Sequence, residues 1–253
     1  MTNTSYMYTT NTSKNLKNMI KVLTNTINFK DIIETFTKTD NVGFYMIHLE
    51  RAVDRLPLIK DLEERLGIRL HIFNGANGNE LVKNGHPTIC QILGPPATRT
   101  AGDIGCTVSH INICKDALSK KYDYIVIFED DCVFTSDLST LYDSFEQFNK
   151  LNISWDLFLL GMNSVKSAHI PDTNVSIVKD FNCTHACILN VKFMNELINT
   201  YQEYYNNNTT LPIDAIYSKI LKSNKVDGYG FNQKYFIQPS GIFSYIIEGI
   251  RYH

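Results

Sequence analysis

The chain has 253 residues, with 24 Lys and Arg against 26 Asp and Glu, and therefore a formal net charge of −2. Its 43% hydrophobic and 20% charged residues exclude a disordered or collagen-like chain, and the near-neutral charge gives no support for a nucleic-acid-binding protein. A chain of this length buries roughly 70–75% of its unfolded surface, so folding requires neither a metal nor a disulfide. We expect the six widely spaced cysteines to be reduced.

The N-terminal part differs in pattern from the rest of the chain. Residues 1–13 are rich in Thr and Asn without apolar periodicity, which predicts a flexible arm. Residues 14–41 place apolar side chains between lysines at helical spacing, which predicts a helical extension of one or two helices packed on the domain. No apolar run of about 18 residues and no secretory leader is present, so we expect a cytoplasmic protein without a transmembrane segment.

Residues 42–253 contain no linker or internal repeat, and we expect them to form a single domain. Apolar runs alternate with helical patterns in this part, and such alternation predicts an α/β fold with a mostly parallel sheet flanked by helices. A long, irregular loop is expected over 79–102, which holds three prolines and three glycines. The predicted strands are 42–49, 69–73, 124–128 and 157–160, and the predicted helices are 56–66, 106–120, 135–149 and 191–204.

Three adjacent carboxylates, Glu129, Asp130 and Asp131, directly follow the predicted strand 124–128. Open α/β sheets bind ligands at the carboxyl ends of their strands. Since alternate residues of an extended segment point the same way, Glu129 and Asp131 can face one point while Asp130 turns aside. A bound Mg²⁺ or Mn²⁺ would offset the mutual repulsion of these groups and would bridge a diphosphate. A solvated acidic turn that caps the next helix explains the tripeptide equally well.

A second candidate precedes the predicted helix 106–120, where Gly102 and Gly105 permit tight backbone geometry. Free N–H groups at the start of a helix can hold a phosphate, and Ser109 is one possible cap. His110 would then lie near the first turn, within reach of a phosphate or a sugar. The alternative is a hydrogen-bonded histidine in the core.

A third candidate follows the predicted strand 42–49, where Arg51, Asp54 and Arg55 occur within five residues. If the strands are parallel, both arginines lie at the same sheet edge as the acidic tripeptide and could meet a diphosphate. Asp54 could bind a ribose hydroxyl or pair with an arginine. The alternative is a charged helix start with internal ion pairs.

These segments, in this order, resemble glycosyltransferase family 25, the family of bacterial lipooligosaccharide glycosyltransferases and collagen galactosyltransferases. The resemblance covers about residues 42–247. The motifs that carry it are Leu49-Glu-Arg-x-x-Asp-Arg55, Gly102-Asp-Ile-Gly-Cys-x-x-Ser-His110, Glu129-Asp-Asp131, Trp155-Asp-Leu-Phe-Leu-Leu-Gly161, Thr184-His-Ala-Cys-Ile-Leu189 and Ile213-Asp214.

The resemblance implies a fold and an activity. The fold is of GT-A type, a Rossmann-like and mostly parallel sheet flanked by helices, and residues 42–253 would form this glycosyltransferase domain. The activity is inverting transfer of a hexose, galactose or glucose, from a UDP-sugar, with Mn²⁺ or Mg²⁺ as cofactor. The implied acceptor is a glycan, a lipooligosaccharide or a hydroxylysine-type group.

Residue roles are carried over by motif. The resemblance implies that Asp131 binds the metal and that Glu129 is a second ligand or faces the ribose or metal-bound water. It counts Glu129 and Asp214 as catalytic. It assigns donor binding to Arg51, Asp54, Arg55, Gly105, Ser109, His110 and Asp130.

An inverting transfer needs a base that takes the proton of the acceptor hydroxyl. Asp214 is the first candidate for this base, with Asp156 and Glu248 in reserve, although a helix N-cap would also explain Asp214. His185 is expected to line the acceptor site. Its flanking cysteines, Cys183 and Cys187, do not have the usual two-plus-two spacing of a zinc site.

Two functions from other classes compete with a glycosyltransferase. One is a catalytically inactive descendant that binds a glycan or a nucleotide. The other is a sugar nucleotidyltransferase, which would need a glycine-rich, basic phosphate loop after the first strand. This chain has Leu49-Glu-Arg-Ala-Val-Asp-Arg-Leu56 there, without glycine.

Overall fold

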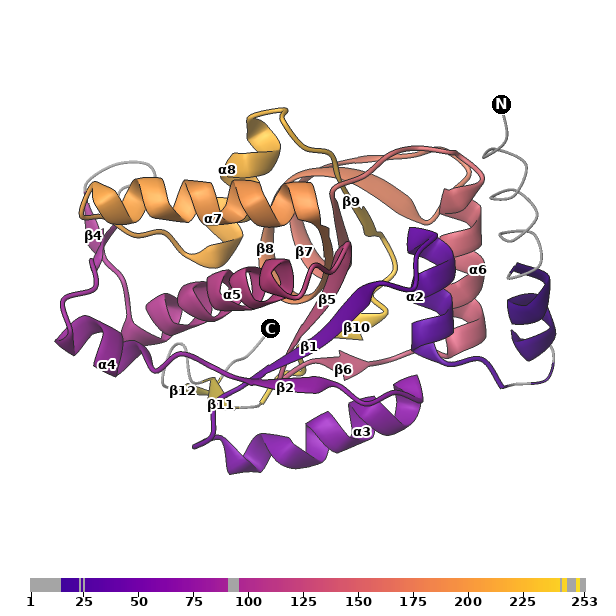
Figure 1. Cartoon of the computed structure of the whole chain (residues 1–253), viewed down its shortest axis with the longest axis horizontal. Helices are drawn as coiled ribbons and strands as arrows, with labels where there is room; N and C mark the ends of the chain where they lie inside the picture. The colour runs from indigo at the N-terminus through magenta and orange to yellow at the C-terminus, as the bar shows by residue number, and fades with distance from the viewer. Residues whose placement is uncertain are drawn as a thin grey trace.

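The computed structural model describes residues 15–22, 24, 26–90, 96–241, 243–244 and 249–250. A six-stranded sheet forms its centre (Figure 1). Its strands are β1 (Val42–His48), β2 (His71–Asn74), β5 (Tyr124–Glu129), β7 (Leu157–His169), β8 (Val175–Asn190) and β9 (Gly228–Phe231). The spatial order is β2-β1-β5-β8-β7-β9, and among these six strands β8 alone runs against the others. The predicted mostly parallel sheet is therefore confirmed.

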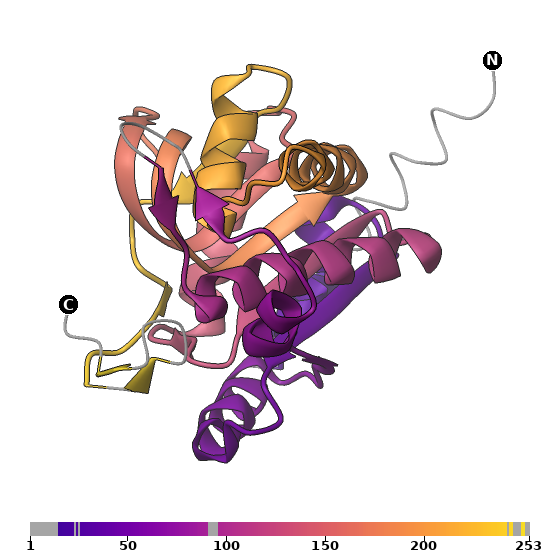
Figure 2. The same cartoon turned by 90° about the vertical axis from the view of Figure 1, so that its left-hand side faces the viewer.

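Helices cover both faces of the sheet: Figure 2 shows α7 (Val191–Asn206) and α8 (Ile213–Lys222), coloured orange to gold, in the upper part of the view and α3 (Leu56–Leu66), in purple, at the bottom. One face carries α2 (Phe29–Thr37), α3 and α6 (Leu138–Asn149), and the other carries α5 (Ala101–Ser119), α7 and α8. Within β5, Val126 and Phe128 pack on the first face, whereas Ile125 and Ile127 pack on the second. Burial on both faces explains the unbroken apolar run that predicts this strand.

Local sequence signals place several helix ends correctly. The predicted helix 56–66 coincides with α3, and Gly67 ends it in the left-handed conformation at φ 63°. A short 3₁₀ turn, η1 (Val53–Arg55), leads into this helix. The predicted helices 135–149 and 191–204 correspond to α6 and α7 within three residues at each end.

The prediction of an irregular loop over 79–102 is wrong in part. Residues 78–83 form the helix α4 (Gly78–Lys83), because the Asn77 side chain accepts a hydrogen bond from the Asn79 N–H and caps its first turn. Two short strands, β3 (Ile89–Cys90) and β4 (Ala97–Thr98), pair antiparallel in the same segment. Capping by a short polar side chain outweighed the proline and glycine content here.

The predicted start of the next helix is also wrong, because α5 begins five residues earlier than expected. Thr100 forms a capping box with Asp103: the Thr100 hydroxyl accepts from the Asp103 N–H, and the Asp103 carboxylate accepts from the Thr100 N–H. Gly105, Ser109 and His110 therefore lie inside the helix and not at its N-terminus. The expected phosphate site on their free N–H groups is not formed.

The strand β8 is the largest element that the sequence analysis missed. It follows β7 in a long hairpin whose register shifts several times, and β9 pairs with the start of both strands. Polar residues such as Lys179, Asp180 and Asn182 interrupt the apolar run over this strand, so periodicity alone does not mark it. Its antiparallel course places Thr184 beside the end of β5.

The N-terminal extension contains two helices, over residues 15–22 and in α2. A capping box between Asn28 and Asp31 starts α2, whose apolar side chains enter the main core. The Phe36 ring stacks on Trp155 with centroids 4.7 Å apart and planes 10° apart. The α2 helix thus shares one core with the sheet. The arm predicted over residues 1–13 lies outside the described residues.

Candidate active site

Parallel strands bring three chain segments to one edge of the sheet. Ile47 of β1 pairs with Glu129 of β5, and His48 pairs with Asn74 of β2, so these strands end level with one another. The segments that follow them carry the arginines at 51 and 55, the glycines at 75 and 78, and the acidic tripeptide. This edge is where open α/β sheets place their ligands.

The carboxylates of Glu129 and Asp131 converge on one amide group. The Gln238 Nε2 atom donates to Asp131 Oδ1 at 2.9 Å and lies 3.4 Å from Glu129 Oε2. The Thr184 hydroxyl donates to the other Glu129 oxygen at 2.8 Å. Two acids separated by one residue therefore face the same point, as predicted, but Asp130 and Asp131 form a turn, closed by the Cys132 N–H bonding the Glu129 carbonyl at 2.9 Å, and not the extended segment expected.

Gln238 reaches this point through a small second sheet. The strand β6 (Val133–Phe134) pairs antiparallel with β10 (Phe236–Ile237), so that Gln238 lies next to the acidic tripeptide. A role for Gln238 is not predicted from the sequence, because a pairing across more than 100 residues has no local signal. The only hint in the sequence is the Gln238-Pro239 pair close to the C-terminus.

Asp130 turns away from its neighbours and pairs with His48, whose Nδ1 lies 2.8 Å from Asp130 Oδ2. Burial raises the pKa of Asp130 to about 6, and the charge of Asp131 adds to this rise, while the His48 hydrogen bond opposes it. The contact between these two residues, 82 positions apart, is not predicted from the sequence. Asp130 still lines the cavity described below, so a role beside the donor stays a prediction.

Glu129 behaves differently from Asp130 although both are largely buried. Burial acts to raise its pKa, but the hydrogen bond and charge of His110 and the Thr184 hydroxyl outweigh burial, so the pKa of Glu129 lies below its ordinary value. The His110 Nε2 atom is 3.3 Å from Glu129 Oε1. Glu129 is thus held in its ionised form.

His110 corrects one expectation of the sequence analysis. It is 0% exposed, its Nδ1 lies 3.1 Å from the Tyr217 hydroxyl, and its Nε2 faces Glu129. Since α5 begins at Ala101, His110 sits in the third turn behind the acidic group. His110 therefore does not lie in the first turn, where it was expected to reach a phosphate or a sugar. It is a hydrogen-bonded histidine of the core.

Arg55 and Arg51 occupy unlike environments in the same region. Arg55 is 2% exposed, with Nη1 at 3.9 Å from Asp131 Oδ2 and Nε at 3.8 Å from Asp54 Oδ2. Arg51 is exposed, and Asp54 is 52% exposed. Of the two roles that the sequence left open for Asp54, the structure shows the pairing with an arginine.

A first cavity opens at this edge between the ends of β1 and β5 and the start of α5. Both arginines, the acidic tripeptide and several glycines line it. Its lining residues are Ile47, Leu49, Arg51, Arg55, Gly75, Ala76, Gly78, Asn79, Ala101, Gly102, Gly105, Cys106, Ser109, Glu129, Asp130 and Asp131. Positive charge, backbone and carboxylates thus meet in one concave surface.

Gly105 and Ser109 form the wall of the first cavity by holding two segments together. A Cβ at Gly105 would lie 2.6 Å from the Ala76 carbonyl oxygen, so only glycine allows this close approach of α5 to the segment after β2. Ser109 Oγ accepts a hydrogen bond from the Ala76 N–H at 2.8 Å and donates to the Gly105 carbonyl. Both residues shape the cavity, and Ser109 has its hydroxyl engaged within the protein.

A second cavity of about 710 Å³ adjoins the first, and Cys106 and Glu129 line both. Asp214 lines it from the first turn of α8, where its Oδ1 accepts from the Ala215 N–H at 2.8 Å. Burial raises the pKa of Asp214, and the charge of Glu129 adds to the rise. The N-cap position belongs to Pro212, so Asp214 is not the helix cap that the sequence left open.

Three other candidates from the sequence do not join the site. Asp156 lies at the opposite sheet end, where Asn190 and Lys192 bond its carboxylate. The buried His185 Nε2 is 3.0 Å from the Phe236 carbonyl oxygen, so it supports the strand before Gln238 and does not line the second cavity. Glu248 lies outside the described residues. All six cysteines are free.

A family model described as "Glycosyltransferase family 25 (LPS biosynthesis protein)" matches residues 41–217, more than two thirds of the chain. The chain therefore belongs to glycosyltransferase family 25. The match ends before Gln238, although the resemblance deduced from the sequence extended to about residue 247.

Curated relatives share only part of this chain. The human protein "Inactive glycosyltransferase 25 family member 3" is 33% identical over 69 residues, which are 27% of this chain and 12% of the human one. The rat "Probable inactive glycosyltransferase 25 family member 3" is 32% identical over 81 residues, 32% of this chain and 14% of its own. The chain thus covers about an eighth of the length of these relatives.

Solved structures resemble the chain distantly. A197 from STIV gives a TM-score of 0.41 at 14% identity and covers 75% of this chain and 81% of its own. A UDP-glucose pyrophosphorylase in its apo form gives a TM-score of 0.34 at 12% identity, over 50% of this chain and 51% of its own. Across the described residues, every helix is too short or too polar to reach through a lipid bilayer.

Proposed function

We propose that this protein is a metal-dependent glycosyltransferase that moves a hexose, galactose or glucose, from a UDP-sugar to an acceptor hydroxyl with inversion. The proposal rests on the position of Glu129, which lines two adjoining cavities with different lining residues. Two substrates that react at one sugar carbon need two such compartments with a common border. The acceptor we propose is a glycan, a lipooligosaccharide or a hydroxylysine-type group.

The first cavity, with a volume of about 80 Å³, suits the diphosphate part of a UDP-sugar. Arg51 and Arg55 supply positive charge toward the diphosphate, and the buried guanidinium of Arg55 is held in place beside Asp131. Gly75, Gly78 and Gly105 line this cavity, and the close backbone contacts at Gly78 and Gly105 fix its wall. Loss of positive charge here is expected to weaken UDP binding.

The acidic edge of the first cavity fits a hard divalent cation. Glu129 and Asp131 offer carboxylate oxygens that converge on one point, and such oxygens are the ligands that Mg²⁺ and Mn²⁺ prefer. We propose that Asp131 and Glu129 hold this ion, which when bound would neutralise the charge that develops on the leaving diphosphate. Gln238 and Arg55 supply hydrogen-bonding and charge partners to the same carboxylates.

The second cavity suits the acceptor, and Asp214 is the proposed base. Its carboxylate would take the proton of the acceptor hydroxyl while the oxygen forms its bond to the sugar carbon and the bond to UDP breaks. A pKa raised by burial makes Asp214 a better proton acceptor than an exposed aspartate, provided that it is ionised at the working pH. Gly105 and Ser109 are proposed to shape the donor site rather than to react.

One observation favours a second candidate function. The curated relatives carry the word "inactive" in their names, so an inactive descendant that binds a glycan or a nucleotide is the competing proposal. The acidic residues of this chain converge and are held in place, which is the arrangement that catalysis needs. Binding of UDP without turnover of any UDP-sugar would favour the inactive protein.

The test is release of UDP from a panel of UDP-sugars with Mn²⁺ and with EDTA. We expect one UDP-hexose to be turned over only with the metal, and the variant Asp131→Asn to lose this turnover while its thermal unfolding stays close to that of the wild type. Wild-type turnover in Asp131→Asn would disprove the metal assignment. Absence of both UDP binding and turnover in the wild type would refute the proposed function.

A further inference from the structure

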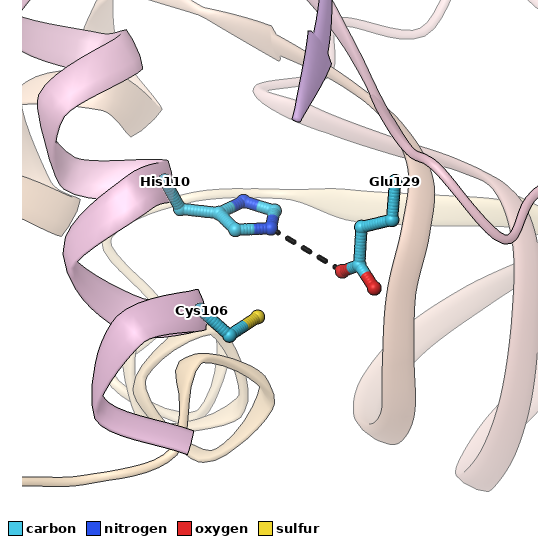
Figure 3. A group of neighbouring side chains, drawn as sticks. All are labelled: Cys106, His110 and Glu129. Carbon is cyan, nitrogen blue, oxygen red and sulfur yellow. Dashed lines mark hydrogen bonds and ion pairs between the residues drawn. The ribbon is translucent and has the colours of Figure 1, made fainter. Parts of the chain in front are cut away.

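A cluster of three side chains of mixed chemistry lies at the border of the two cavities (Figure 3). Cys106 and His110 are one turn apart on α5, and both point toward Glu129 at the end of β5. Their possible ligand atoms, one sulfur, one ring nitrogen and one carboxylate oxygen, all lie within 4.8 Å of one another. A thiol, an imidazole and a carboxylate are a ligand set that is typical of Zn²⁺.

The spacing of these atoms is close to that of a tetrahedral metal centre. Bonds of about 2.0–2.3 Å place the ligand atoms of such a centre roughly 3.3–3.8 Å apart. The His110 Nε2 and Glu129 Oε1 atoms, 3.3 Å apart, already have this spacing. The Cys106 sulfur lies within 4.8 Å of both atoms and needs to approach by roughly an ångström at most.

Neighbouring residues orient two of the three groups. The His110 Nδ1 lies 3.1 Å from the Tyr217 hydroxyl, so the ring can keep its proton on Nδ1 once a cation displaces the Nε2 proton that faces Glu129. The Thr184 hydroxyl holds Glu129 by a 2.8 Å hydrogen bond. Metal-binding histidines are regularly fixed in this way through their second nitrogen.

The cluster also has an entry path. Cys106 and Glu129 line both cavities, so an ion can reach the cluster from solvent, whereas His110 is fully buried behind it. Three protein ligands leave a fourth position open toward the cavities for water or a ligand group. Catalytic zinc sites have this pattern of three protein ligands and one open position, whereas structural zinc sites are closed by four protein ligands.

We propose that Cys106, His110 and Glu129 form a binding site for a thiolate-preferring divalent cation such as Zn²⁺. On binding, the Cys106 thiol and His110 Nε2 each lose a proton to solvent, and the sulfur, the ring nitrogen and a Glu129 oxygen coordinate the ion. The site shares Glu129 with the proposed Mn²⁺ site, but Cys106 and His110 take the place of Asp131, and the Glu129 oxygen that faces His110 is Oε1 whereas Oε2 faces Gln238. It does not depend on the proposed glycosyl transfer.

The test uses Co²⁺ as a coloured substitute for Zn²⁺, added to the purified full chain. We expect thiolate-to-Co²⁺ charge-transfer absorption at one ion per chain, which one equivalent of Zn²⁺ removes and a large excess of Mg²⁺ does not. Cys106→Ser should abolish this absorption. The matched control is Cys183→Ser, which removes the other cysteine of the second cavity and should retain the absorption.

A second variant tests the orientation of the ligands without touching them. Tyr217→Phe removes the hydroxyl beside His110 Nδ1 and should weaken Zn²⁺ binding, measured by calorimetry, about 10–100-fold while the fold is kept. The proposal is overturned if the wild type shows no thiolate absorption with Co²⁺. It is equally overturned if the absorption persists in Cys106→Ser or is lost to the same extent in Cys183→Ser.

Discussion

Glu129 and Asp130 are neighbours in the chain and are both largely buried, yet their pKa values move in opposite directions. His110 and Thr184 stabilise the charged form of Glu129 strongly enough to outweigh burial. Asp130 has His48 as a partner but also faces the charge of Asp131, and burial prevails. Hydrogen-bond partners, rather than depth alone, therefore decide which of these acids is ionised.

The raised pKa of Asp130 predicts a pH-dependent stability effect. The folded protein binds this proton more tightly than the unfolded chain, so the stability contributed by Asp130 is lost as the pH rises from about 4 to about 6. Asp130→Asn should therefore raise the free energy of unfolding of the metal-free protein by about 1–3 kcal/mol at pH 7.5 and change it little at pH 4. Urea denaturation at both pH values measures this, and an equal effect at both would contradict the raised pKa.

The proposed role of Asp214 can be separated from a role in donor binding. Asp214→Asn should lower transfer to the acceptor about 10²–10⁴-fold, because the amide cannot accept the proton, while UDP binding in the other cavity stays unchanged. The matched control is Asp180→Asn in the same cavity, whose carboxylate is held by Lys222 at 2.6 Å and should matter much less. Equal loss of transfer and UDP binding in Asp214→Asn would remove it as the base.

At the scale of elements, the start of α5 sets the position of the first cavity. Its capping box begins the helix at Ala101, and the helix then passes so close to the segment after β2 that only glycine fits at two points of contact. A Cβ at Gly78 would lie 1.6 Å from the Ala101 carbonyl oxygen. The contact is between backbones, which cannot yield as a flexible side chain can.

This close contact predicts a difference between two glycines of the same cavity wall. Gly105→Ala should lower the free energy of unfolding by about 1–3 kcal/mol and weaken UDP binding, since its Cβ would meet the Ala76 carbonyl oxygen. Gly75→Ala should cost less, because its Cβ would meet the movable side chain of Leu49 at 3.1 Å. Thermal unfolding and UDP titration compare the two, and equal effects would argue against the backbone contact.

At the scale of the whole molecule, segments near both ends of the described chain contribute to the core and to the candidate site. Aromatic rings of α2 pack between the sheet and α6, where Phe36 contacts Phe145 and Trp155. From the other end of the chain, β10 carries Gln238 to the acidic tripeptide. The core and the candidate site thus both depend on segments far apart in the sequence.

The packing of α2 predicts that the N-terminal extension carries part of the stability. Phe36→Ala should lower the free energy of unfolding by about 3–5 kcal/mol, since the buried ring leaves a cavity in the core. Leu16→Ala is the control: Leu16 lies in the helix over 15–22 and is 59% exposed, so its loss should change stability by less than about 0.5 kcal/mol. Chemical denaturation measures both, and a small effect of Phe36→Ala would mean that α2 does not share the main core.

Much of the fold could be predicted from local patterns. The apolar runs predict β1 and β5, and apolar spacing with Gly67 as a stop predicts α3. The prediction that Glu129 and Asp131 face one point is met, although through a turn at Asp130 and Asp131 and not through the alternation of an extended segment. The start of α5 was a local signal as well, in the Thr100 and Asp103 capping box, but the glycines that follow obscured it. Such features depend on residues within a turn or two of one another.

The class of fold, the family and the acidic tripeptide at the end of β5 follow from the sequence alone, because they depend on hydrophobic periodicity and on the order of motifs along the chain. The tertiary structure alone decided that β8 runs antiparallel beside β5, that Gln238 joins Glu129 and Asp131, and that His48 holds Asp130. It also placed His110 in the core, where it faces Glu129 and Cys106. These contacts join residues up to 109 positions apart, and pairing of this kind follows from how strands and helices pack, which no local pattern encodes.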